Sequence, residues 1–210
     1  MKRRGRKPET FYKKYRGKIK ELVGGFMESE RVEAYIGRAL LAMIGLGGIL
    51  LIGAVTPNIF SAFGKFHQKH RYSEKQIIAS YFYLRKRGLV KLIKKSEKTH
   101  EIKITKQGRT MLIEFAIESL KLKNQEKWDG KWRVVVFDIP ERDGDARRAL
   151  RRKFKELGLF QLQRSVFIYP YPLEEEIQFI GAFFDVEKYI EILTVERMLD
   201  DKDLRKHFQL

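Results

Sequence analysis

The sequence predicts an α+β protein in two parts, an N-terminal winged helix-turn-helix followed by a ferredoxin-like βαββαβ sandwich. The charge divides in the same way, because residues 1–100 contain 23 Lys and Arg against 7 Asp and Glu, while residues 101–210 contain 21 against 20. The apolar pattern also changes, from mainly helical spacing in the first half to strands that alternate with helices in the second. A polar segment at residues 121–131 separates the halves and is interpreted as a linker.

The composition excludes several classes of protein. A chain of 210 residues that is 43% hydrophobic buries a core, which excludes a disordered tail or a fibrous repeat. The absence of cysteine excludes disulfides, thiolate nucleophiles and cysteine metal sites, and it fits a cytoplasmic protein. The net charge of +17 favours a polyanionic partner, either nucleic acid or an acidic membrane surface.

Residues 1–37 are predicted to form a basic arm and one helix. Residues 1–10 are basic and contain Gly5 and Pro8, so no regular structure is expected there. Residues 11–26 have helical spacing of apolar side chains, which predicts an amphipathic helix closed by Gly24-Gly25. Such a helix suits a membrane surface or phosphates, or lies on its own domain.

A long apolar stretch, Ala39–Val55, opens the predicted winged helix domain at residues 38–120. One interpretation is a buried core helix. The alternative is an inner-membrane anchor, since about 17 residues is the short limit for crossing a bilayer. We favour the core helix, because runs this short are more often core. After a Thr-Pro-Asn break, Ile59–Phe63 is expected to form a second short helix.

The rest of the first domain has clear boundary signals. Ser73 and Gln76 form a predicted capping box that opens a helix, and Gly88 closes this helix behind three cations. Two alternating segments, residues 89–93 and 101–105, predict strands joined by a polar tip. Residues 106–108 are expected to form a turn, and residues 109–120 a closing helix. This order of elements is that of a winged helix.

The capped helix is the predicted contact with double-stranded DNA. Its apolar side carries Ile77, Tyr81 and Leu84, and the opposite side is expected to face the major groove, although Phe82 on that side is expected to pack on the wing. Lysines at the wing tip are expected to reach an adjacent phosphate strand. The predicted DNA-binding residues are Lys75, Gln76, Ala79, Tyr83 and Lys86 on the helix, and Lys94, Lys95 and Lys98 on the wing.

The second half, residues 132–210, is predicted to be the sandwich and the dimerisation domain. Strands are expected at residues 132–139, 160–163, 165–169 and 189–195, with helices at residues 146–157 and 173–183 between them. The first of these helices carries a stripe of cations, which is interpreted as a solvated surface. The stripe consists of Arg147, Arg148, Arg151, Arg152 and Lys155. Trp128 and Trp132 are expected to pack between the domains.

Three segments of this half carry a resemblance to known families. Lys127-Trp128-Asp129-Gly130-Lys131-Trp132-Arg133, Phe137-Asp138-Ile139-Pro140 and Ser165-Val166-Phe167 resemble the PaaX-like transcriptional repressors, in which a winged helix precedes a WDG-x-W linker and the sandwich. They are also similar to the CRISPR-associated endonuclease Cas-two. The first resemblance implies a repressor. The C-terminal extension typical of that family is missing after about residue 208, so the resemblance does not extend to an acyl-CoA effector site, and the effector stays open.

The second resemblance raises a metal-dependent nuclease as the alternative function. Asp138 matches the position at which that endonuclease family keeps a metal-binding aspartate. Two copies in a twofold dimer would provide the oxygen ligands that Mg²⁺ prefers. One aspartate per chain is a poor site by itself, so we favour no catalytic residue, no metal and no cofactor. His67 and His70 lack further ligands, and we expect no metal there either. The sequence therefore predicts a cytoplasmic, homodimeric DNA-binding regulator.

Overall fold

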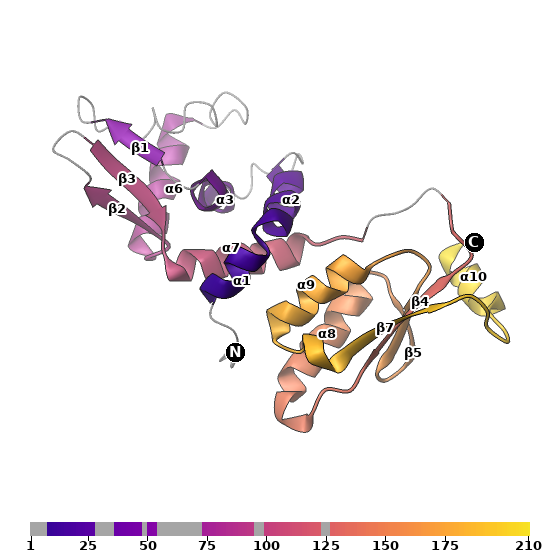
Figure 1. The fold of residues 1–210 in the computed structure, drawn as a ribbon. Coiled ribbons are helices and arrows are strands. Elements are labelled where there is room, and N and C mark those ends of the chain that lie inside the picture. The colour runs from indigo at the N-terminus through magenta and orange to yellow at the C-terminus, as the bar shows by residue number, and fades with distance from the viewer. Residues whose placement is uncertain (1–7, 28–35, 48–49, 54–72, 95–98, 123–126) are drawn as a thin grey trace. The chain divides into compact units, whose positions relative to one another are not determined.

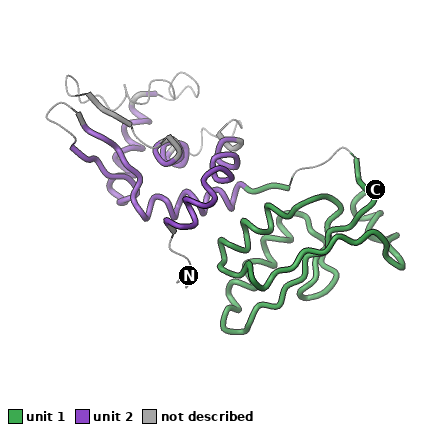
Figure 2. Tube along the Cα trace, viewed as in Figure 1, with its two compact units in different colours: residues 1–6, 120–210 green, residues 7–119 purple. Residues whose placement is uncertain are grey.

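The computed structural model describes residues 8–27, 36–47, 50–53, 73–94, 99–122 and 127–210, and these residues divide into two units (Figures 1 and 2). The first unit contains residues 7–119, and the second contains residues 120–210. Both units combine helices with an antiparallel sheet, so the predicted α+β class is confirmed. Ile59–Phe63, His67 and His70 lie outside the described residues.

The first unit is built on a three-stranded sheet of order β1-β3-β2, and every neighbouring pair is antiparallel (Figure 1). In the register of the sheet, Ile102 in β3 lies opposite Leu50 in β1 and Leu92 in β2. The elements are α1 (Pro8–Lys14), α2 (Arg16–Met27), α3 (Ile36–Gly47), β1 (Leu50–Gly53), α6 (Glu74–Lys86), β2 (Val90–Lys94), β3 (Thr99–Ile104) and α7 (Lys106–Ser119).

The apolar stretch 39–55 is divided between a helix and a strand, so the prediction of one continuous helix was wrong. Its first part lies in α3, where Leu40, Leu41 and Ile44 are buried against the inner side of α6. The helix ends at Gly47, and Leu50–Gly53 forms β1, which pairs with β3. Glycines favour such an interruption because they weaken a helix. Among the described residues, no helix is both long and apolar enough to span a bilayer.

The N-terminal helices pack on their own unit. Phe11, Tyr12, Ile19 and Val23 are buried, and α1 and α2 both contact α7. The hydroxyl of Tyr12 donates to the carbonyl oxygen of Gly45 in α3 at 2.5 Å. The predicted single helix is two helices divided at residue 15, and residues 24–25 continue α2 instead of closing it. Glycines lower helix stability, and the burial of Ile19 and Val23 before them offsets part of this loss.

The second unit is a four-stranded antiparallel sheet of order β5-β6-β4-β7, the order of a ferredoxin-like sandwich. On one face, Phe137 and Phe167 contact Phe154 of α8. Their ring centroids lie 6.0 and 5.3 Å, respectively, from the ring centroid of Phe154. On the other face, Trp132 packs with Leu204 of α10. The elements are β4 (Trp132–Phe137), α8 (Gly144–Glu156), β5 (Phe160–Gln163), β6 (Val166–Tyr169), α9 (Glu174–Phe184), β7 (Ile190–Val195) and α10 (Lys202–Phe208).

Candidate nucleic-acid interface

Helix α6 is fixed at its start and along its inner side. The backbone N–H of Gln76 donates to the Ser73 hydroxyl at 3.3 Å, and the Ser73 N–H donates to the Gln76 side-chain oxygen at 2.9 Å. These two bonds are the predicted capping box. Ile77, Tyr81 and Leu84 are no more than 1% exposed, as predicted. The helix therefore presents its other side to solvent in one orientation.

The outer side of α6 carries every helical residue that was predicted to contact DNA. Lys75, Ala79 and Lys86 lie along one stripe at spacings of four and seven residues, and all are exposed. Phe82 shares this stripe and is 52% exposed. The wing tip lies outside the described residues, so the packing of Phe82 on the wing stays a prediction. The neighbouring stripe presents Gln76, Tyr83 and Arg87. Glu74 is the only acidic residue in the sequence of α6.

Tyr83 is oriented by Arg87, a residue that the sequence prediction of the site omitted. The Arg87 Nη1 atom donates to the Tyr83 hydroxyl at 2.8 Å, and its guanidinium lies 5.6 Å from the ring centroid. The hydroxyl oxygen thus accepts a hydrogen bond, which leaves its own proton for an external acceptor. The spacing of four residues on a helix was the signal that could have identified this pair.

A close turn joins α6 to the sheet and to α7. Gly88 has φ +68, a left-handed conformation that favours glycine. The Thr105 hydroxyl donates to the Gly88 carbonyl at 2.6 Å. It also accepts from the N–H of Gly108 at 3.1 Å, so residues 106–108 begin α7 and the predicted turn there was wrong. A Cβ on Gly108 would lie 2.1 Å from the Leu89 carbonyl oxygen, which explains the glycine.

The sheet adds further cations to this unit. Lys94 is exposed at the end of β2, whereas Lys95 and Lys98 lie outside the described residues. Lys91, which was not predicted as a site residue, is exposed and lies directly opposite Lys103 in the register. Lys103 is compensated by Glu101, whose carboxylate lies 3.1 Å from its Nζ atom. Lys91 and Lys94 are therefore the cations of β2 that could meet phosphates.

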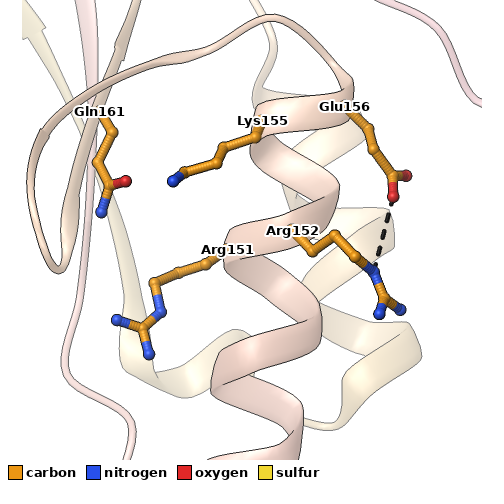
Figure 3. A pocket seen from close by; sticks show the side chains of 5 residues that line it. All are labelled: Arg151, Arg152, Lys155, Glu156 and Gln161. Atoms are coloured by element: carbon orange, nitrogen blue, oxygen red, sulfur yellow. Dashed lines mark ion pairs between the residues drawn. The ribbon is translucent and has the colours of Figure 1, made fainter.

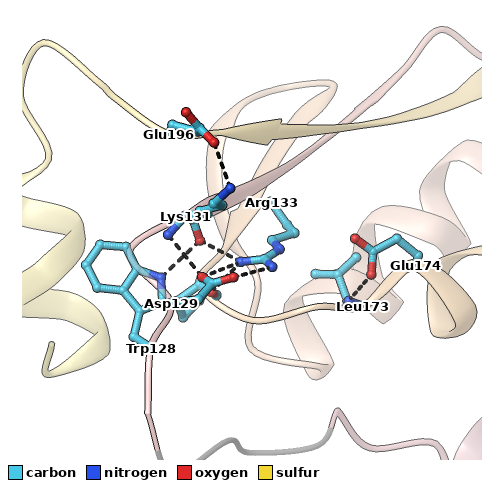
Figure 4. Close-up of polar contacts among 8 residues, drawn as sticks. Trp128, Asp129, Lys131, Arg133, Leu173, Glu174 and Glu196 are labelled. Atoms are coloured by element: carbon cyan, nitrogen blue, oxygen red, sulfur yellow. Dashed lines mark hydrogen bonds and ion pairs between the residues drawn. The ribbon is translucent and has the colours of Figure 1, made fainter.

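The segment with the tryptophan motif is structural. The Asp129 carboxylate accepts two hydrogen bonds from Arg133, both at 2.7 Å, as Figure 4 shows. This guanidinium holds the pKa of Asp129 at about 2, well below its ordinary value of 3.8. Arg133 also donates to the carbonyls of Lys131 and Pro170. Gly130 has φ +78, so the turn between these partners favours glycine.

Both tryptophans pack inside the second unit, which corrects the expectation that they lie between domains. Their ring centroids are 4.8 Å apart, and the Arg205 guanidinium lies 4.6 Å from the Trp128 ring. The Trp132 indole N–H donates to Asp201 at 3.1 Å. Helix α10 supplies Arg205, and the sequence prediction omitted this helix. The apolar spacing of Leu204 and Phe208 was the signal that could have identified it.

Asp138 follows β4 as an exposed residue. Its backbone N–H donates to the Tyr189 carbonyl at 3.0 Å. Nowhere in the described parts of the chain do three or more His, Cys, Asp or Glu side chains gather as metal ligands. A single exposed carboxylate does not fit a magnesium site within one chain. Sharing of Mg²⁺ between two copies of Asp138 requires a second chain and stays a prediction.

Comparison with known proteins finds a family that the second unit resembles. Residues 125–207 match the family model described as the PaaX protein central Cas2-like domain. This range includes the tryptophan motif, the four-stranded sheet and most of α10. No curated protein matches the chain.

Proposed function

We propose that this chain, whose residues 125–207 are a PaaX central Cas2-like domain, is a transcriptional regulator that binds double-stranded DNA through the exposed side of α6. The family domain suggests regulation of transcription in general. The contact with DNA, the winged helix and the repressor role are the parts that we add. The observation that carries the proposal is the outer side of α6, where cations and hydrogen-bonding side chains are exposed opposite a buried anchor.

The chemistry of this side suits the major groove. The groove admits an α-helix, and lysines bind phosphates or the acceptor edge of guanine. The capping box occupies the Gln76 side-chain oxygen, which leaves the amide nitrogen of Gln76 to donate to a base or a phosphate, and Ala79 is small enough for the helix to approach the bases. Tyr83 has a hydroxyl proton for a phosphate oxygen. The outer side of α6 thus combines groups that position the helix with groups that read bases.

The surrounding elements support a winged helix. Among the described residues of this unit, α3, β1, α6, β2, β3 and α7 occur in an order compatible with that fold, and β3 lies between β1 and β2. In such domains the recognition helix precedes the strand pair, as α6 precedes β2 and β3. Lys91 and Lys94 on β2 would then bind the phosphates beside the groove.

Repression follows from occupancy, because a protein bound in the major groove of a promoter excludes other proteins from it. A twofold dimer would place two α6 helices on two half-sites. We assign dimerisation to the second unit, in which β7 is an edge strand of the described sheet and Leu193 on it is 51% exposed.

Leu193→Glu is expected to convert the dimer to a monomer in sedimentation-velocity experiments. An unchanged sedimentation coefficient would contradict this assignment.

The DNA contact is tested with a charge-reversed pair and a matched control. Duplexes are first enriched from fragmented genomic DNA by their binding to the wild-type chain. Lys75→Glu with Lys86→Glu is expected to abolish retention of these duplexes in a gel shift, because both lysines face the groove. Lys202→Glu with Lys206→Glu changes the net charge equally at exposed positions of α10 and is expected to leave retention in place. Equal behaviour of the two pairs would refute the assignment of the interface.

A further inference from the structure

Four of the cations of α8 fall into two pairs that differ in their partners. Arg148 pairs with Asp145, and Arg152 lies 3.6 Å from the Glu156 carboxylate. Arg151 and Lys155 form no ion pair with any residue that the structure describes. Both pairs belong to the stripe that was interpreted as a solvated surface. Neighbouring acids therefore neutralise Arg148 and Arg152, whereas Arg151 and Lys155 keep their full charge.

The unneutralised cations line a hollow. Its lining consists of Arg151, Arg152, Lys155 and Glu156 of α8 together with Gln161. Figure 3 shows that Arg151 and Lys155 point toward Gln161, whereas Arg152 and Glu156 point away from it. Its volume is about 590 Å³. Gln161 belongs to β5, an edge strand of the described sheet, and it donates through its side-chain nitrogen to the Gln163 carbonyl at 3.2 Å. The second amide hydrogen of Gln161 stays available to a ligand.

Leaving these two cations adjacent carries a cost. Arg151 and Lys155 are separated by four residues, a spacing at which like charges destabilise a helix. The negative end of the helix dipole offsets this cost for Lys155, which lies in the last turn. Arg151 lies one turn earlier, where the dipole falls off. An anion bound between the two side chains would compensate both charges.

We infer that this hollow binds the phosphodiester backbone of nucleic acid, as a second contact in addition to the one made by α6. The inference rests on the proposed DNA-binding function. The planar guanidinium of Arg151 fits two phosphate oxygens at once, and the ammonium of Lys155 fits a further oxygen as a point charge. Gln161 supplies a neutral donor from the sheet. None of these groups requires a particular base, so this contact adds affinity without sequence preference.

The test compares two double variants of α8 in the full chain, using the enriched duplexes. Arg151→Gln with Lys155→Gln removes the unneutralised pair. Arg148→Gln with Arg152→Gln removes the same charge from the same helix, but from residues already paired with acids. Each lost phosphate contact lowers the slope of log K against log salt by about 0.9. The first variant is therefore expected to lower the slope by about 1.8, so that its loss of affinity between 50 and 200 mM salt is about 12-fold smaller than that of the wild type.

The outcomes separate this inference from the proposed function. If the wild-type chain retains no duplex, the proposed function fails and the inference fails with it. If the wild type retains duplex but the two double variants have equal slopes, the second contact is refuted while the role of α6 stands. A free phosphorylated molecule is the competing occupant, and inorganic pyrophosphate is the probe for it. The nucleic-acid assignment would be overturned by two results together. Pyrophosphate would raise the melting temperature of the wild type but not that of Arg151→Gln with Lys155→Gln, and the two double variants would have equal slopes of log K against log salt.

Discussion

The bidentate pair of Asp129 and Arg133 makes a quantitative prediction about stability. A fall in the pKa of Asp129 from 3.8 to about 2 corresponds to at most about 2.4 kcal/mol of stability. The Asp129 side chain is 43% exposed, so solvent screening reduces this figure. We expect Asp129→Asn, which keeps the shape and removes the charge, to lower the free energy of unfolding by about 1 kcal/mol at neutral pH.

The effect depends on pH in a defined direction. The pKa of Asp129 is depressed in the folded state, so its contribution is fully present well above the unfolded value of 3.8 and is lost as the pH falls through about 2. About half of it is expected to be lost near pH 3. The difference between wild type and Asp129→Asn should therefore be constant between pH 5 and pH 7 and shrink below pH 4.

Urea unfolding followed by tryptophan fluorescence measures this difference. Both tryptophans of the chain, Trp128 and Trp132, lie in the second unit, so their emission reports the unfolding of that unit in the full-length protein. Asp129→Glu is a useful comparison, because it keeps the charge and changes the geometry. A free energy of unfolding for Asp129→Asn that equals the wild-type value at pH 7, or a difference that grows as the pH falls, would refute the reasoning.

Three further substitutions test the packing. Gly108→Ala is expected to destabilise the first unit by about 2–4 kcal/mol, because its Cβ would overlap the Leu89 carbonyl. Thermal unfolding followed by circular dichroism measures this loss, and an unchanged melting temperature would contradict the close approach. Tyr12→Phe removes the donor to the Gly45 carbonyl and should cost about 1 kcal/mol in the same assay; no loss would mean that this bond contributes nothing. Gly130→Ala places a side chain at φ +78 and should cost about 1 kcal/mol by tryptophan fluorescence, and a stability equal to the wild-type value would argue against the turn.

The sequence predicted best where local signals determine structure. The capping box at Ser73 and the helical spacing of Ile77, Tyr81 and Leu84 defined both the start of α6 and its buried side, so the exposed residues followed by geometry. The strand order in the second unit follows from its alternation of strands and helices. Each of these features depends on residues that are close together in the chain.

Features that depend on distant partners were missed. The apolar stretch 39–55 contains both a helix and a strand, and only pairing of residues 50–53 with β3 decides which part is which. Helix α10 is short and polar, and it becomes stable by packing Leu204 and Phe208 against the sheet. The α8 cations were interpreted as one solvated stripe because the sequence does not show that Arg151 and Lys155 line a hollow with Gln161 of β5.

The proximity of α6 to bound DNA can be measured directly with a single thiol. The chain has no cysteine, so Ala79→Cys introduces one thiol at the centre of the outer side of α6, and Lys202→Cys introduces one on α10 as the control. The rate of alkylation by a maleimide is measured for each variant with and without saturating enriched duplex. DNA bound through α6 predicts at least roughly 10-fold slower alkylation of the thiol from Ala79→Cys and an unchanged rate for the control, since a helix in the major groove excludes the reagent. An unchanged rate at position 79 in the saturated complex would contradict binding through α6.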